Sequence, residues 1–167
     1  MDTLTYTLII VFVIGIIITF VLLRKKTKEP LPEPLDLTEP ANWSIEELNF
    51  MVDWNIHRKH NGLTIINDDD IIKILTQGRV KMWIKNEVPK ENLHDGFAFH
   101  AKPYYNKGYT KLDENVQAGY TGDSIMEKYQ LSSSHNRSLL QPGAKSGAIT
   151  IRKNHLGKNR TCLIVTK

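Results

Sequence analysis

The feature that most constrains this chain is an apolar run without a charged residue, which covers residues 4–23. Its only polar side chains are one tyrosine and three threonines. Twenty helical residues span about 30 Å, which is the thickness of the hydrocarbon layer of a bilayer. A helix that is apolar on all sides suits a membrane better than the half-buried surface of a soluble domain. The sequence therefore predicts a single transmembrane helix over residues 4–23.

A cleaved signal peptide is the alternative interpretation of this run, and its flanks argue against it. The chain begins Met1-Asp2-Thr3 without a basic residue, and no small-residue cleavage motif follows the run. The predicted organisation is a transmembrane helix over 4–23, a stalk over 24–41 and one domain over 42–167. The stalk begins with basic residues and then holds four of the seven prolines, which favours a semi-rigid spacer.

Charge next to the run predicts its orientation. Arg24, Lys25 and Lys26 follow it directly, whereas only Asp2 precedes it. The positive-inside rule then places the C-terminal domain on the cytosolic side. Three acceptor sequences for N-glycosylation point the other way, and we give them less weight: Asn42-Trp43-Ser44, Asn136-Arg137-Ser138 and Asn159-Arg160-Thr161. The basic residues after the run also predict contact with the lipid bilayer.

The composition of the remaining chain fits one globular domain. Apolar residues make up 41% of the sequence, and the single cysteine, Cys162, excludes an internal disulfide. The net charge of +4 is dispersed, without a basic stripe interleaved with aromatic residues. We therefore expect no nucleic-acid partner.

Two helices are predicted at the start of this domain. Ser44 and Glu47 form a capping box, and apolar residues follow at helical spacing until Asn61-Gly62: Ile45, Leu48, Val52 and Ile56. A second helix starts in Asn67–Asp70, where caps and negative charge suit a helix N-terminus. Three consecutive aspartates could also bind a cation, but a capped helix start is the simpler interpretation. Gly78 inside this helix suggests close packing.

The second half of the domain predicts less regular structure. Residues 90–121 read as loops with short extended pieces, and a third helix is expected over 123–131. Residues 147–152 and 160–166 are rich in β-branched side chains and predict a closing β-hairpin. Helices at the front and a hairpin at the end indicate an α+β fold with layers.

Three residues of this half form a candidate site: His100, Glu114 and His135. Two imidazoles and a carboxylate are the donor set of a zinc or similar divalent-metal site. The same set could act as a general acid and base with an orienting group. It could also be a buried hydrogen-bond network that only stabilises the fold.

The order of motifs over residues 44–167 resembles the CAP superfamily, also called SCP, and most closely its disulfide-free bacterial branch. The matching segments are Asn55–Gly62, Phe99-His100, Asp113–Val116, Tyr129–Asn136, Leu139–Pro142 and Ser146–Ile149. The resemblance implies an α-β-α sandwich whose cavity, lined by His100, Glu114 and His135, binds a divalent metal. Family members often have a second glutamate at about Ser132, so the set of four is incomplete here.

The hypothesis that follows is a membrane-anchored CAP-like module without enzymatic activity. It would present a cavity or surface to a protein, lipid or glycan near the bilayer. A metal-assisted hydrolase or protease is a second hypothesis, based on the same histidines and glutamate. A structural role in a virion or envelope layer, with the anchor in an internal viral membrane, is a third.

Overall fold

The computed structural model describes residues 33–119 and 125–167. The predicted membrane span, 4–23, and the first part of the predicted stalk lie outside these residues. Within them, no helix combines the length and the apolar character needed to cross a bilayer. The contacts divide the chain into two units, and the second, Pro34–Lys167, is the domain described below.

The two predicted helices at the start of the domain are confirmed. Helix α2 covers Ile45–His60, and Ser44 and Glu47 form the expected capping box at its start. Helix α3 covers Asp70–Lys85, and the Asp69 carboxylate accepts a hydrogen bond from the backbone N–H of Ile72. Asp69 is thus the cap of α3, and its carboxylate also accepts bonds from the hydroxyl groups of Tyr109 and Ser146.

The prediction for the middle of the chain was wrong in part, because it missed a helix; the short extended pieces it expected include a strand. A short 3-10 turn over Lys90–Asn92 leads to α4, Phe97–Tyr105, and to β2, Leu112–Ala118. The N-cap residue of α4 is Gly96, which has no side chain to cap the helix, and the helix contains Pro103. Such a segment has no start signal and little intrinsic stability as a helix. Burial of Ala101 and Tyr104 in the core stabilises it instead.

The C-terminal hairpin was predicted correctly. Strands β3, Ser146–Lys153, and β4, Asn159–Thr166, pair antiparallel, with Thr150 opposite Cys162. Helix α5, Ile125–Leu131, matches the described part of the predicted third helix, and α6, Ser133–Leu139, follows it without having been predicted. In the described residues the sheet has four strands in the order β1-β3-β4-β2, where β1 is the two-residue strand Asn67–Asp68.

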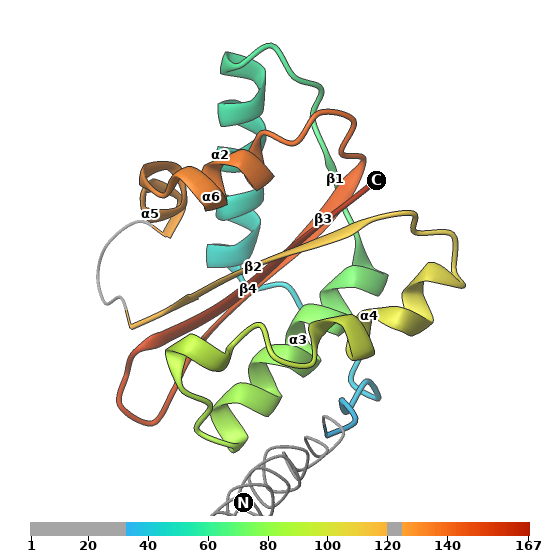
Figure 1. The fold of residues 1–167 in the computed structure, drawn as a ribbon. Coiled ribbons are helices and arrows are strands. Elements are labelled where there is room, and N and C mark those ends of the chain that lie inside the picture. The colour runs from blue at the N-terminus through green and yellow to red at the C-terminus, as the bar shows by residue number, and fades with distance from the viewer. Residues whose placement is uncertain (1–32, 120–124) are drawn as a thin grey trace, which may run out of the picture. The chain divides into compact units, whose positions relative to one another are not determined.

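Helices cover both faces of this sheet (Figure 1). On one face, α2, α5 and α6 pack on Ile149, Ile151, Leu163 and Val165. On the other face, α3 and α4 pack on Ala148, Cys162 and Ile164. Successive strand residues point to opposite faces, so β3 and β4 contribute to two separate cores. The domain is therefore a helix–sheet–helix sandwich.

The described part of the predicted stalk lies along α3. A Cβ atom added to Gly78 would meet Leu37 Cδ2 at 3.0 Å and the Asp36 carbonyl oxygen at 3.3 Å. The Lys81 ammonium group lies 2.8 Å from a carboxylate oxygen of both Asp36 and Glu39. Gly78 therefore marks a close approach, as the sequence suggested, and the approaching chain is the segment before α2.

Candidate functional site

Arg79 lies at the centre of the site that the resemblance pointed to. It is fully buried on the side of α3 that faces the sheet. Each of its five N–H groups has an acceptor, and these acceptors come from β2, α4 and the loop between α3 and α4. They are both carboxylate oxygens of Glu114, the carbonyl oxygens of Leu93 and Asp95, and Nδ1 of His100.

The Glu114 carboxylate is held by this guanidinium. Arg79 Nε lies 2.8 Å from Oε1, and Arg79 Nη2 lies 3.1 Å from Oε2. The side chain of Glu114 is only 1% exposed. A second contact comes from the exposed His94, whose Nδ1 lies 3.0 Å from Oε2. The carboxylate is therefore neutralised by a two-bond ion pair and carries an exposed imidazole on its outer side.

His100 belongs to the same cluster, but in a role that differs from the expected one. Its Nδ1 lies 3.0 Å from Arg79 Nη1. Because a guanidinium group can only donate, Nδ1 of His100 must accept this bond. That nitrogen uses its lone pair on Arg79, and the proton of the neutral ring then sits on Nε2. In this state neither ring nitrogen offers a lone pair to a metal.

His135 lies on α6, where its ring packs against the ring of Tyr129 at 4.9 Å between centroids. Burial lowers the pKa of His135, and the nearby charges of His94 and Lys90 lower it further. Tyr129 is itself fully buried, and burial raises the pKa of its hydroxyl group. Of the three predicted ligands, the structure thus joins His100 and Glu114 through Arg79, and it gives His135 an aromatic contact.

These residues, as arranged, do not fit a divalent cation. Arg79 already places a fixed positive charge on both oxygens of the carboxylate. Within residues 33–119 and 125–167, no group of three or more His, Cys, Asp or Glu side chains is arranged to hold a metal ion. We therefore assign no step to a metal here.

Sequence reasoning missed Arg79, although a signal was present. Position 79 lies four residues after Leu75 and four before Trp83, on the apolar face of α3. A charged residue on the apolar face of a helix needs a buried partner, since an unpaired buried charge is very costly. The position of Arg79 therefore predicts a buried acceptor for its charge, and the structure identifies that acceptor as Glu114.

A second buried ion pair lies at the edge of the sheet. Lys73 Nζ lies 2.8 Å from Glu47 Oε2, and both side chains are fully buried. The carbonyl of Ile149 accepts a bond from Lys73, and Glu47 accepts one from the N–H of Ile151. Burial would raise the pKa of Glu47, but the bonds from Lys73 and two backbone N–H groups hold it below its usual value. This pair therefore bonds to the part of β3 that follows its short pairing with β1.

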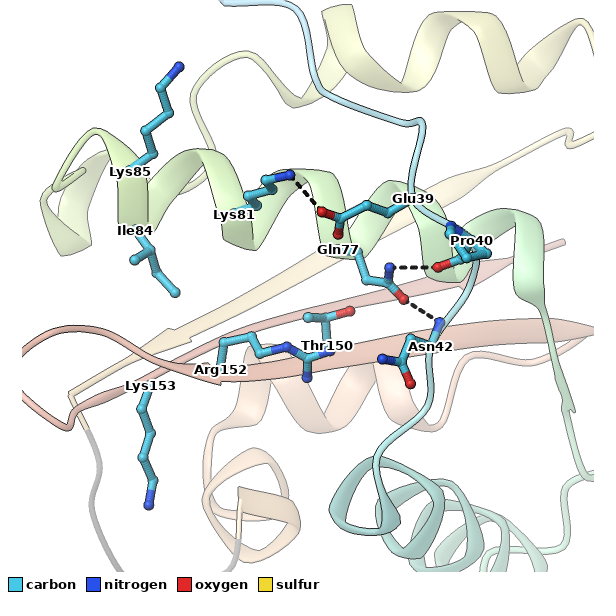
Figure 2. Close-up of a pocket in the computed structure, with 10 residues that line it drawn as sticks. All are labelled: Glu39, Pro40, Asn42, Gln77, Lys81, Ile84, Lys85, Thr150, Arg152 and Lys153. Atoms are coloured by element: carbon cyan, nitrogen blue, oxygen red, sulfur yellow. Dashed lines mark hydrogen bonds and ion pairs between the residues drawn. The ribbon is translucent and has the colours of Figure 1, made fainter.

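A hollow of about 650 Å³ lies between α3 and β3 in the described domain (Figure 2). Four basic side chains and one acidic side chain line it, together with polar and apolar residues: Lys81, Lys85, Arg152, Lys153, Glu39, Pro40, Asn42, Gln77, Ile84 and Thr150. The Gln77 amide closes one end, because it bonds to both the Pro40 carbonyl and the Asn42 N–H. The hollow shares no lining residue with the Arg79 cluster.

Comparisons with known proteins support the fold. No family model and no curated protein matches the sequence. Among solved structures, an outer surface protein from Borrelia burgdorferi superposes with a TM-score of 0.66 at 12% identity, over 77% of this chain and 97% of that one. An extracellular SCP-domain protein from Bacillus anthracis gives 0.60 at 17% identity. A cysteine-rich secretory protein from Staphylococcus aureus gives 0.57 at 12% identity.

The last two matches cover 73% of this chain but only 40% and 39% of the bacterial chains. The likeness therefore concerns one domain of those proteins. At these identities it establishes the fold alone, which is the mixed α/β fold of CAP domains. The fold predicted from the order of motifs is confirmed at that level.

Proposed function

We propose that this chain is a membrane-tethered CAP-like binding module without enzymatic activity. The observation that carries the proposal is that every N–H group of Arg79 is hydrogen-bonded. Arg79 donates to both carboxylate oxygens of Glu114 and to Nδ1 of His100. Both oxygens of this carboxylate already accept bonds from Arg79, so a metal would have to displace a buried guanidinium. The cluster therefore stabilises the sandwich, and binding falls to other surfaces.

The hollow between α3 and β3 is the surface we assign to a partner. Its lining carries four basic side chains against one acidic one, although Lys81 and Arg152 are already paired with carboxylates. A positively charged groove favours an acidic or phosphate-bearing group on a protein, lipid or glycan. Charge reversal at the exposed Lys153 (Lys153→Glu) should weaken binding to vesicles containing anionic lipid, relative to neutral vesicles. The same reversal at Lys102, which is exposed on α4 and does not line the hollow, serves as the control.

A metal titration tests the core of the proposal. A metal that binds the folded state raises its melting temperature by mass action. We expect excess zinc or magnesium to leave the melting temperature of the full chain unchanged. A saturable rise that disappears in Glu114→Gln would instead establish a metal site at this carboxylate and overturn the proposal.

Hydrolysis is the second candidate, favoured by one observation. His94 is 59% exposed, and its Nδ1 contacts the buried Glu114, so the carboxylate orients an imidazole that faces solvent. The test is a panel of peptides and esters offered to the wild type and to His94→Gln. Turnover that is lost in His94→Gln, with an unchanged melting temperature, would support this second function.

We also propose, from the charges beside residues 4–23, that the domain faces the cytosol. The names of the similar bacterial proteins describe an outer surface protein and an extracellular protein, so the question is worth a direct test. Protease added outside intact cells should leave the domain uncut. Digestion of the domain under these conditions would place it on the opposite side of the membrane.

A further inference from the structure

Helix α2 has two apolar faces, and only one of them packs on the sheet. The side chains that predicted the helix point away from the sheet, and each is more than 40% exposed: Ile45 at 78%, Val52 at 58%, Ile56 at 47% and Leu48 at 41%. The packed face consists of other residues, namely Glu47, Phe50, Met51, Trp54 and Arg58. The sequence pattern therefore identified the helix correctly, but it marked the outward face.

The four exposed side chains form one continuous stripe. At about 100° per residue, they fall within about 80° of the helix circumference, roughly opposite Trp54. Lys59 continues the same line beyond Ile56. A stripe of branched aliphatic side chains at this spacing is the surface that packs against another helix.

Charge on α2 decides between possible partners. Glu46 and Asp53 are exposed beside the stripe, and an anionic bilayer would repel them. The first turn of α2 carries Glu46, whereas the last turn is basic, with Lys59 and His60. A helix with one acidic and one basic end is complementary to an antiparallel copy of itself. The two helix dipoles then also point in opposite directions, which is the favourable arrangement. Two-fold symmetry requires this kind of self-complementary patch.

We propose that the α2 stripe is a self-association surface on which two copies of this chain pair antiparallel. In this arrangement Glu46 of one copy lies near Lys59 of the other, and the Val52 side chains of both copies meet near the two-fold axis. The contact is small, so the dimer is weak in dilute solution. Confinement to one membrane would raise the effective concentration and favour the pair. The proposal rests on α2 alone and does not depend on the tether.

Site-directed cross-linking of the full chain tests this geometry. The native cysteine, Cys162, is buried, so the unmodified chain provides the background for a short bis-maleimide. We expect Val52→Cys to cross-link to itself several-fold more than Leu156→Cys, a matched exposed leucine in the β3–β4 turn. Ile45→Cys should cross-link weakly to itself but efficiently to Lys59→Cys in a mixture of the two variants. Efficient self-linking at both Ile45 and Val52 would indicate parallel helices and overturn the antiparallel arrangement.

Charge reversal provides an independent test. Glu46→Lys and Lys59→Glu should each weaken Val52→Cys cross-linking, and the double reversal should restore it. Val52→Glu, at an exposed position, should abolish association on a sizing column with light scattering while the melting temperature stays unchanged. If the native chain stays monomeric at every concentration, or if the stripe instead binds neutral vesicles and Val52→Glu abolishes that binding, the proposed partner is wrong.

Discussion

Arg79 and Glu114 show how single buried charges shape this domain. The two side chains are 0% and 1% exposed, and the guanidinium has no unused N–H group. A buried charge with a full set of hydrogen bonds is tolerated, whereas the same charge without its partner is strongly destabilising. Arg58 is equally buried but bonds only to carbonyl oxygens, and its Nη2 has no partner within the described structure. Burial lowers the pKa of Arg58, in keeping with this poorer environment.

Replacement of Arg79 should therefore lower the free energy of unfolding, and the size of the loss should depend on whether Glu114 is present. We expect Arg79→Met to reduce the free energy of unfolding by about 3–5 kcal/mol, because it leaves a buried carboxylate unpaired. The double variant Arg79→Met with Glu114→Leu should be more stable than Arg79→Met alone. Urea unfolding of the four proteins of this cycle measures the coupling, and simple additivity would contradict the ion pair.

His135 should make stability depend on pH. Its folded pKa lies below the usual value of 6.5, because burial disfavours the charged ring, so the folded state holds fewer protons than the unfolded state near that value. Its contribution is therefore complete above pH 6.5 and is lost as the pH falls through the folded pKa. When the pH is lowered from about 7.5 to about 5, the melting temperature of His135→Gln should fall by less than that of the wild type. Equal losses would mean that His135 does not titrate differently in the fold.

At the level of secondary-structure elements, side chains cover the edge of β3 that has no neighbouring strand in the part of the chain that the structure describes, and they bond to its backbone groups. Strand β1 pairs only with Ser146 and Gly147, which leaves the rest of this edge, within the described residues, without a neighbouring strand. Lys73 and Glu47 then supply the missing bonds to Ile149 and Ile151. Burial lowers the pKa of Lys73 to about 8, although Glu47 raises it. Unpaired strand edges promote aggregation, so this cover has a clear physical benefit.

Loss of this cover should be visible at one backbone group. In Glu47→Ala, the amide hydrogen of Ile151 should exchange with solvent much faster, because the carboxylate that accepts its bond is removed. The amides of β4, which lies inside the sheet, serve as the internal control in the same sample. Unchanged protection of Ile151 would show that Glu47 does not cap the edge.

For the molecule as a whole, the segment before α2 decides where the domain begins. The sequence places this boundary at residue 42, with a spacer before it. Yet residues 34–41 contact α3 through Leu35, Leu37 and the ion pairs of Lys81. A chain that starts at residue 42 should therefore melt a few degrees below one that starts at residue 34, since it exposes apolar surface on α3. Equal melting temperatures would show that residues 34–41 do not stabilise the domain and act only as a spacer.

Much of the fold could be predicted from the sequence, for local reasons. The capping box at Ser44, the aspartates before α3 and the β-branched hairpin all depend on residues close together in the chain. Helix α4 and the position of strand β2 within 90–121 could not be predicted, because distant core contacts stabilise them. The candidate site was found in part: His100 and Glu114 belong to one cluster, but Arg79 and His94 were missed.

The sequence by itself determined helices α2 and α3 and the closing hairpin, because caps, turn residues and β-branched side chains act on their immediate neighbours. Only the tertiary structure decided which face of α2 packs, since a helical repeat of apolar residues is equally regular on the inner and the outer side. The tertiary structure also decided which positive group neutralises the Glu114 carboxylate. A carboxylate can be balanced by any cation that the fold brings to it, and here α3 brings the guanidinium of Arg79.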